Sequence, residues 1–104
     1  MNKGWQEVTT EQVEQRLSHD PEIQLIDVRN PDEYEDDHIP GAKLIPLSEL
    51  PARTNEIDHN REVIFICRSG NRSGKACEYM AQLGYSKMYN MVGGMLAWTG
   101  KRER

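Results

Sequence analysis

The chain has 104 residues, 37% of them hydrophobic, and a formal net charge of −4 at pH 7. This length predicts one domain that needs no disulfide staples, and the acidic balance argues against a nucleic-acid surface, because phosphate binding needs a basic face. No apolar run approaches the roughly 20 residues that cross a bilayer and no hydrophobic leader opens the chain, so we expect a cytoplasmic protein without a membrane partner.

Short apolar runs alternate with helical patterns along the chain, which indicates an α/β domain with helices on both faces of an open, mainly parallel sheet. We expect a single domain over residues 1–104, with its core at about 6–100. About five strands are predicted, at Gln6–Val8, Gln24–Val28, Lys43–Ile45, Val63–Cys67 and Met88–Met91. The fourth is the most apolar, as expected of a central strand that is covered on both faces.

Capping signals place the first two helices. The first should begin at Thr9 or Thr10, because Thr9 and Gln12 have the spacing of a capping box. The second should begin at Pro31, with Asn30 as its cap.

The helical signals in the second half of the chain are uneven. Between residues 46 and 60 they are weak and indicate a helix broken by Pro51. A stronger helix should follow Ser73 and end before Gly84, with its apolar face made of Ala76, Cys77, Met80, Ala81 and Leu83. A last helix should follow Gly93–Gly94 and carry Leu96, Ala97 and Trp98.

Cys67 ends the predicted central strand, at the sheet edge where open α/β folds bind ligands. The residues before the next helix must curl tightly, and Gly70 and Asn71 are able to take positive φ. Such a curl turns backbone amides inward, and the amides of the following helix N-terminus join them to form an anion cradle.

Arg68 and Arg72 add positive charge beside this cradle. With the helix dipole they should lower the pKa of the Cys67 thiol from about 8.5 to roughly 3.5–7.5 and make it a nucleophile at neutral pH. The alternative is that Cys67 is only the last buried residue of a strand, and the basic cluster argues against it. Cys77 lies on the apolar helix face, where core packing is the better interpretation. The two cysteines match no zinc pattern, so we expect no metal and no cofactor.

The segment Cys67–Arg72 resembles the active-site loop of rhodanese-type sulfurtransferases, in the form Cys-Arg-x-Gly-x-Arg/Thr that is associated with thiosulfate-using members. Further stretches are similar to the two end signatures of that family, namely Ile26–Arg29, Glu33–Tyr34 and His38–Ala42 for the first, and Val92–Met95 with Trp98 for the second. The resemblance implies a rhodanese-like open sheet and covers most of the chain.

The resemblance also implies an activity. A rhodanese moves sulfane sulfur from thiosulfate or a similar donor to a thiophilic acceptor, cyanide or a thiol, through a persulfide that would form here on Cys67. It implies that Asp27 and Arg29 support the loop, for which a plain ion pair is the alternative. It assigns substrate binding to the residues after the cysteine, which are Arg68, Ser69, Gly70, Asn71, Arg72 and Ser73. Ser73 is also expected to cap the helix, and His38 to have a structural role.

Two other functions stay open. Cysteine phosphatases and arsenate reductases use the same chemistry, and the phosphatases that share the rhodanese fold have one residue more between the cysteine and the arginine than the four found here. The smaller ring suits a single sulfur atom better than a tetrahedral oxyanion. The other alternative is a non-enzymatic module for sulfur relay or protein interaction, with a protein as the sulfur acceptor.

Overall fold

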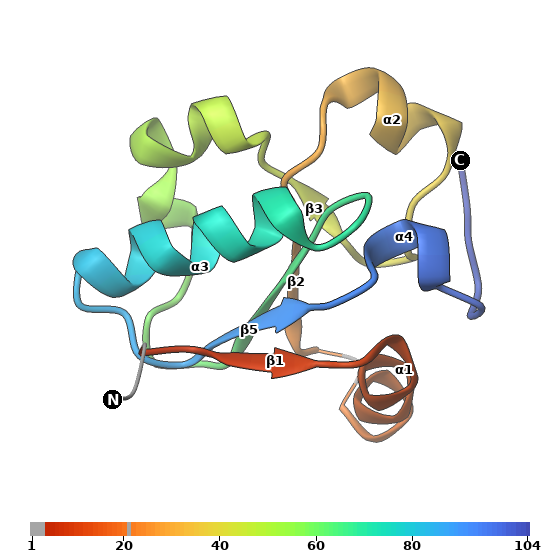
Figure 1. Cartoon of the computed structure of the whole chain (residues 1–104), viewed down its shortest axis with the longest axis horizontal. Coiled ribbons are helices and arrows are strands. Elements are labelled where there is room, and N and C mark those ends of the chain that lie inside the picture. The colour runs from red at the N-terminus through yellow and green to blue at the C-terminus, as the bar shows by residue number, and fades with distance from the viewer. Residues whose placement is uncertain (1–3, 21) are drawn as a thin grey trace.

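A computed structural model describes residues 4–20 and 22–104. The five strands form one sheet in the order β1-β5-β4-β2-β3, and every described pair of neighbours runs parallel. The strands are β1 (Gln6–Val8), β2 (Gln24–Asp27), β3 (Lys43–Leu44), β4 (Val63–Ile66) and β5 (Met88–Met91). The predicted α/β architecture is confirmed, and β4 is central as expected (Figure 1).

Within the described residues, three α-helices connect strands, namely α1 (Thr10–His19), α2 (Pro31–Asp36) and α3 (Asn71–Gln82), and a fourth, α4 (Gly94–Ala97), follows β5. The predicted capping box at α1 is present, since the Gln12 amide donates to Thr9 Oγ1 over 3.1 Å and the Thr9 amide donates to Gln12 Oε1 over 2.9 Å. Asn30 stands at the N-cap of α2 as predicted.

No helix within the described ranges has the length and apolar character that crossing a bilayer requires.

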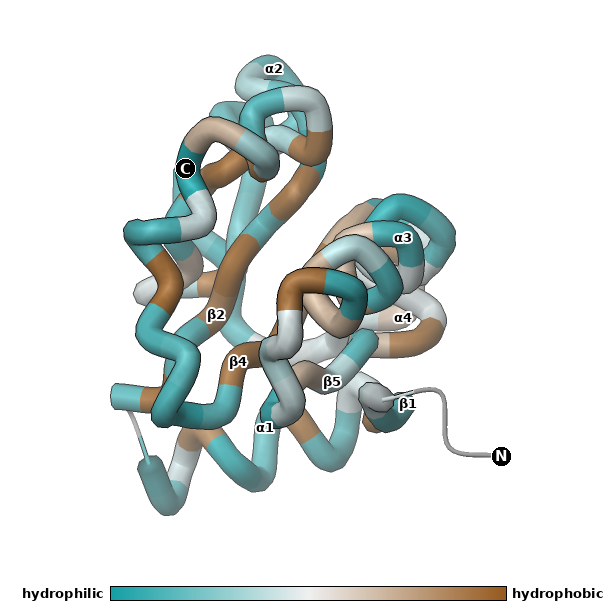
Figure 2. Tube along the Cα trace, turned by 90° about the vertical axis from the view of Figure 1, so that its left-hand side faces the viewer, coloured by the Kyte–Doolittle hydropathy of each residue, from teal (hydrophilic) through white to brown (hydrophobic). Residues whose placement is uncertain are grey.

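The core has two layers, one on each face of the sheet. One layer packs α3 and the segment after β3 against the sheet and includes Phe65, Cys77 and Met80. The other packs α1 and α4 against the opposite face and includes Val13 and Trp98. Figure 1 shows α3 and α1 on opposite sides of the sheet, and Figure 2 shows the apolar stretches of β2 and β4 between the layers.

Several predicted elements need correction. Residues 46–60 form two short 3₁₀ helices, Leu47–Ala52 and Thr54–Glu56, because Pro51 cannot donate the hydrogen bond that a continuous α-helix needs. Helix α3 begins at Asn71, before Ser73. Leu83 follows the last turn of α3 and is 50% exposed, so it does not belong to the apolar face.

The last helix is also shorter than expected. Helix α4 ends at Ala97, Leu96 is 66% exposed, and Trp98 packs in the core just after the helix. Leu96 therefore stands at the surface beside the segment that follows β4, whose Arg68 carbonyl accepts the Leu96 amide.

The register of the central strands brings two predicted site segments together. Asp27 pairs with Ile66, and the Val28 amide donates to the Ile66 carbonyl over 2.9 Å. The residues that follow β2 and those that follow β4 therefore leave the sheet side by side at its carboxyl edge.

Candidate active site

Cys67 directly follows β4, and the next three residues fold its loop back over its own sulfur. Gly70 has a φ of 102° and is the N-cap of α3. This left-handed conformation is available to glycine without steric cost. Asn71, the other residue expected to take positive φ, is helical. As a result the Gly70 amide donates to Cys67 Sγ over 3.0 Å, and Ser73 Oγ lies 3.3 Å from the same sulfur.

The hydrogen bonds around the sulfur favour its ionised form. Burial raises the pKa of the Cys67 thiol, but the Ser73 hydroxyl and the amides of Ser73, Gly70 and Ser69 outweigh it and hold the pKa below its ordinary value. The expected anion cradle is thus present at the level of Sγ. A sulfur anion there is met by backbone amides that already point at it, which is the arrangement a cysteine nucleophile needs.

Ser73 does not cap α3, contrary to expectation. Its side chain is fully buried, and its hydroxyl donates to Asn90 Oδ1 over 2.5 Å. Since α3 already begins at Asn71, Ser73 lies inside the first turn, where its hydroxyl faces the cysteine.

Helix α4 holds the loop from the other side. The Met95 amide donates to the Cys67 carbonyl over 2.9 Å, and the Leu96 amide donates to the Arg68 carbonyl over 3.0 Å. This contact requires a glycine at position 94, which has a φ of 58°. A Cβ there would lie 2.4 Å from the Arg68 carbonyl carbon and 2.6 Å from the Cys67 carbonyl oxygen.

Asn90 was not among the predicted site residues. It lies on β5, is 3% exposed, and donates through Nδ2 to the Gly70 carbonyl over 3.1 Å. Through Oδ1 it accepts the hydroxyl of Ser73. The signal that could have found it is a lone amide side chain in an otherwise apolar strand at the sheet centre, since a buried polar group needs partners.

The two arginines of the loop differ in their surroundings. Arg72 forms a bidentate pair with Glu33 of α2, at 2.7 and 2.9 Å, and this hydrogen bonding lowers the pKa of Glu33 to about 2. Arg68 is exposed and has no ion-pair partner among the described residues. Arg72 also interacts with Cys67 through charge. The pKa of Arg72 is raised mainly by its hydrogen bonds to Glu33 and, to a smaller extent, by an ionised Cys67.

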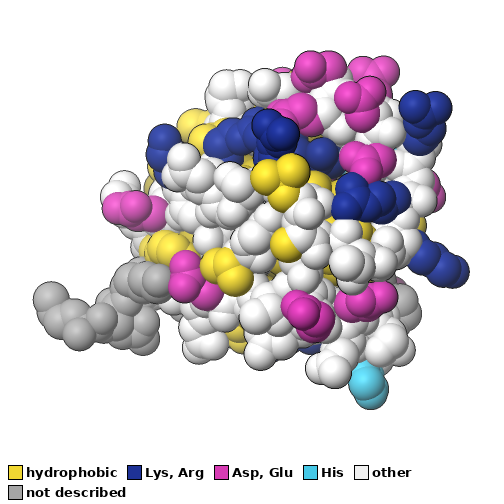
Figure 3. Space-filling view, turned by 45° about the vertical axis from the view of Figure 1, so that its right-hand side comes forward, with side chains coloured by type: hydrophobic (Ala, Val, Ile, Leu, Met, Phe, Trp, Pro, Cys, Tyr) yellow, Lys and Arg dark blue, Asp and Glu magenta, His cyan; other side chains and the backbone are white. Residues whose placement is uncertain are grey.

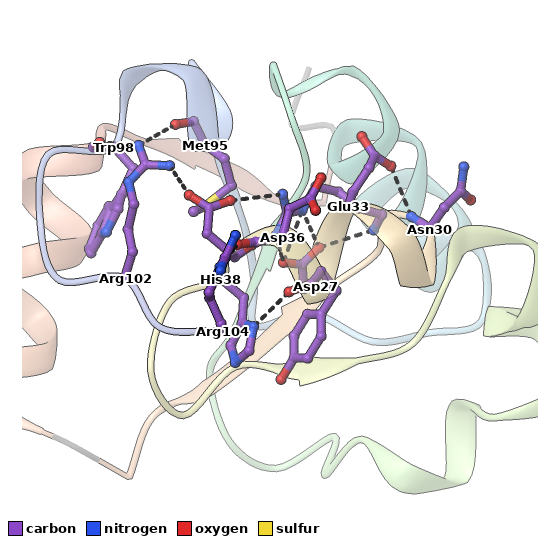
Figure 4. A network of polar contacts seen from close by, with 12 residues as sticks. Asp27, Asn30, Glu33, Asp36, His38, Met95, Trp98, Arg102 and Arg104 are labelled. Atoms are coloured by element: carbon purple, nitrogen blue, oxygen red, sulfur yellow. Dashed lines mark hydrogen bonds and ion pairs between the residues drawn. The ribbon is translucent and has the colours of Figure 1, made fainter.

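Asp27 and Arg29 form a buried pair beside the loop. Arg29 Nη2 donates to Asp27 Oδ2 over 2.8 Å, Nε donates to Asp27 Oδ1 over 2.9 Å, and Arg29 is only 4% exposed. Arg29 Nη2 also donates to the Asp37 carbonyl over 2.7 Å. The pair is therefore not a plain surface ion pair, and it ties the end of β2 to the end of α2 (Figure 4).

The same network reaches α4. Arg102 donates to Asp37 Oδ2 over 2.5 Å, to the Met95 carbonyl over 2.8 Å and to the Trp98 carbonyl over 2.6 Å. Figure 4 shows Arg102 between Met95 and the acidic end of α2. Because α4 donates hydrogen bonds to the cysteine loop, Arg102 supports the loop indirectly through its bonds to α4 and to the residue after it.

His38 belongs to this outer network. Its ring stacks on Tyr34 with centroids 3.7 Å apart, Nδ1 lies 2.8 Å from the Tyr34 carbonyl, and Nε2 lies 3.3 Å from Glu103. These contacts tie α2 to the end of the chain and fit the structural role expected for His38.

Arg68 of the cysteine loop lines a surface depression of about 360 Å³. Side chains of both signs line it, with apolar ones from α4, and its residues are Arg29, Glu33, Asp36, Asp37, Arg68, Met95, Leu96 and Arg102. Figure 3 shows basic and acidic side chains gathered on this side of the molecule. Within residues 4–20 and 22–104, no group of three or more His, Cys, Asp or Glu side chains could hold a metal ion.

The structure thus combines a parallel α/β sheet with a cysteine that directly follows the central strand and has backbone amides around its sulfur. The family model for the rhodanese-like domain matches residues 9–101. The chain therefore belongs to the rhodanese-like domain family.

Relatives and solved structures agree with this membership. The chain is 40% identical to "Sulfurtransferase" of Allochromatium vinosum over 92 residues, which cover 88% of this chain and 86% of that protein. It is 43% identical to "Putative sulfur carrier protein YrkF" of Bacillus subtilis over 97 residues, which are 93% of this chain but only 52%, about half, of that protein. A rhodanese-like domain protein from Staphylococcus aureus superposes with a TM-score of 0.86 at 33% identity, over 92% of this chain and 93% of that one.

Proposed function

We propose that this domain is a thiosulfate sulfurtransferase that carries sulfane sulfur as a persulfide on Cys67. The observation that carries the proposal is the cradle, in which the Gly70 amide and the Ser73 hydroxyl both lie within hydrogen-bond reach of Sγ. Sulfur transfer in general is further supported by the relative in Allochromatium vinosum, which is named a sulfurtransferase.

The proposed reaction has two steps. The Cys67 thiolate attacks the outer sulfur of thiosulfate, the sulfur–sulfur bond breaks, and sulfite leaves with the electron pair. A nucleophilic acceptor, cyanide or a thiol, then attacks the terminal sulfur of the persulfide and releases the Cys67 thiolate. The cradle lowers the energy of the thiolate, which is the attacking group in the first step and the leaving group in the second.

The predicted substrate-binding residues divide into two groups in this proposal. Ser69, Gly70 and Ser73 face the sulfur through their amides, and Ser73 also through its hydroxyl, whereas Asn71 begins α3 between them. Arg68, exposed at the depression, is the cation proposed to meet the incoming dianion. Arg72 is proposed to act through charge from its place in the pair with Glu33, and Asp27 with Arg29 is proposed to keep the neighbouring strand end rigid.

The pairing of Arg72 argues against phosphatase or arsenate reductase activity. A phosphate transition state needs an arginine whose guanidinium is aimed at the oxyanion, and here both terminal nitrogens of Arg72 donate to Glu33 instead. The short loop, with four residues between Cys67 and Arg72, points the same way.

A protein acceptor is a second candidate for the second step. The relative in Bacillus subtilis is named a putative sulfur carrier protein, and the exposed Leu96 beside the depression is an apolar contact that cyanide does not need. The cytoplasmic location expected from the sequence stays part of the proposal.

Mass spectrometry tests the proposal directly. Protein incubated with thiosulfate and freed of excess reagent should gain the mass of one sulfur atom on the peptide that holds Cys67. Added cyanide should remove that mass and release an equal amount of thiocyanate. A sulfur on the peptide that holds Cys77, or no gain with thiosulfate, would contradict the proposal.

A further inference from the structure

The hydroxyl of Ser73 contacts two groups at once. Its oxygen lies 3.3 Å from Cys67 Sγ and 2.5 Å from Asn90 Oδ1. Ser73 is fully buried and Asn90 is 3% exposed, so water does not compete for these contacts. Because a hydroxyl carries a single proton, it donates to only one of the two partners at a time.

The orientation of the Asn90 amide decides which partner that is. Its second contact is the Gly70 carbonyl, 3.1 Å from Nδ2. A carbonyl only accepts, so the amide nitrogen must face Gly70 and the amide oxygen must face Ser73. That oxygen also only accepts, and the Ser73 proton therefore points toward Asn90.

We propose that Asn90 is a positioning residue that fixes the direction of the Ser73 hydroxyl, so that Ser73 accepts a hydrogen bond from the resting thiol of Cys67. The resting order is then Cys67 S–H to Ser73 Oγ, and Ser73 O–H to Asn90 Oδ1. When the thiol ionises, the hydroxyl turns to the thiolate and leaves a buried amide oxygen without its donor. Asn90 therefore opposes ionisation, whereas the Ser73 hydroxyl favours it.

The catalytic meaning of this arrangement rests on the proposed sulfur transfer, although its geometry does not. Cys67 Sγ is an anion when it attacks the donor and again when the acceptor displaces it, and it is neutral in the persulfide between these steps. The hydroxyl would face Sγ in the two anionic states and return to Asn90 in the persulfide. Asn90 would thus affect the relative free energies of the free thiolate and of the persulfide.

Other charges around the loop are unchanged in the variants that test this inference. They are Arg68 of the loop, Arg72 of α3 with its partner Glu33 of α2, and the Asp27–Arg29 pair after β2. Any change in the titration of Cys67 then comes from Ser73 and Asn90.

Titration of the thiolate by its ultraviolet absorbance tests the inference, with Cys67→Ser as the blank that removes the signals of Cys77 and the tyrosines. Asn90→Leu, which keeps the side-chain size and removes the acceptor, should lower the Cys67 midpoint by roughly one pH unit. Asn90→Asp, which strengthens the acceptor, should raise it by a similar amount. Ser73→Ala should raise it as well.

The decisive comparison repeats the Asn90 substitutions in the Ser73→Ala protein. The downward shift from Asn90→Leu should vanish there, because no hydroxyl remains to be released. An equal shift in both backgrounds, or an upward shift from Asn90→Leu with Ser73 present, would overturn the inference and leave Asn90 as a mere brace for Gly70.

If Asn90→Leu does not fold, the near-isosteric Asn90→Asp decides. Its upward shift must be smaller without the Ser73 hydroxyl than with it, and an equal shift would overturn the inference. The titration uses no sulfur donor. Failure of sulfur transfer with this pattern of midpoints intact would therefore count against the proposed function alone.

Discussion

The two cysteines of this chain are almost equally buried, and both belong to the same hydrophobic cluster, yet their surroundings differ. Cys67 is 1% exposed and lies just before α3, and Cys77 is 0% exposed and lies inside the helix. Amides in the first turn of a helix have no acceptor within the helix, so they are available to Cys67. Around position 77 the amides are used by the helix itself. Burial alone does not make a thiol reactive, whereas burial beside unused donors does.

The strongest test of this comparison replaces each cysteine in turn. Cys67→Ser should lower sulfur transfer from thiosulfate by at least on the order of 10³-fold, because a serine hydroxyl is not ionised at neutral pH. Cys77→Ser should keep most of the activity. Thiocyanate production measures both, and thermal melts check that both variants fold. Comparable losses would mean that the two thiols act as a relay.

A second test moves the backbone that presents donors to Cys67. Gly94→Ala would place a Cβ 2.4 Å from the Arg68 carbonyl carbon and push α4 off the loop. We expect the free energy of unfolding to fall by roughly 1–3 kcal/mol or more, and the remaining folded protein to lose activity.

Gly84→Ala is the matched control for Gly94→Ala. Gly84 also has a positive φ, of 94°, but nothing lies within 4 Å of an added Cβ. It should destabilise the protein through backbone strain while leaving the activity of the folded fraction intact. Denaturant unfolding and activity per folded molecule separate the two effects, and equal activity losses would mean that strain, not contact with the loop, is responsible.

The third test concerns the charge outside the cradle. Arg68→Ala should lower kcat/KM for thiosulfate by roughly 5- to 150-fold, as expected for the loss of a hydrogen bond to a charged group of about 1–3 kcal/mol. The value of kcat/KM for mercaptopyruvate, a second sulfur donor with a single carboxylate, should fall less. Lys75→Ala, which removes an exposed cation from α3, is the control and should change the two rates little. An unchanged donor preference in Arg68→Ala would remove Arg68 from substrate selection.

The smallest effect is expected from the pair between α2 and α3. Arg72 lowers the pKa of Glu33 from 4.5 to about 2, so the pair contributes stability that is present above pH 4.5 and is lost as the pH falls toward 2. Glu33→Gln should therefore melt below the parent at pH 6 by a few degrees, and the two should converge near pH 2. Glu35→Gln, an exposed position of the same helix, should melt with the parent throughout. A constant gap for Glu33→Gln would rule out the ion pair as its cause.

Signals that lie close together in the sequence predicted the structure well. The strands, the Thr9 capping box and the place of Cys67 follow from local patterns of apolar and capping residues. The bounds of α3 and α4 did not follow from local patterns. Gly70 and Gly93 are the N-caps of these helices in left-handed conformation, so each helix begins at the next residue.

Partners that lie far apart in the sequence were not predictable. Arg72 follows the cysteine without a nearby acid, yet Glu33 reaches it from 39 residues away. The sequence marks Asn90 as an amide in a strand, but only the fold shows that its partners are Gly70 and Ser73. Such pairings depend on strand order, which a single sequence does not specify.

The order of the strands also determines when the cysteine loop is completed during synthesis. Strand β5 fills the gap between β1 and β4, and Asn90, Met95 and Leu96 then supply the last contacts to the cysteine loop. Ribosomes make the N-terminal part first. A nascent chain therefore carries Cys67 without these contacts to its loop until nearly all of the domain has been translated, and under the proposed function no sulfur transfer is expected before that point.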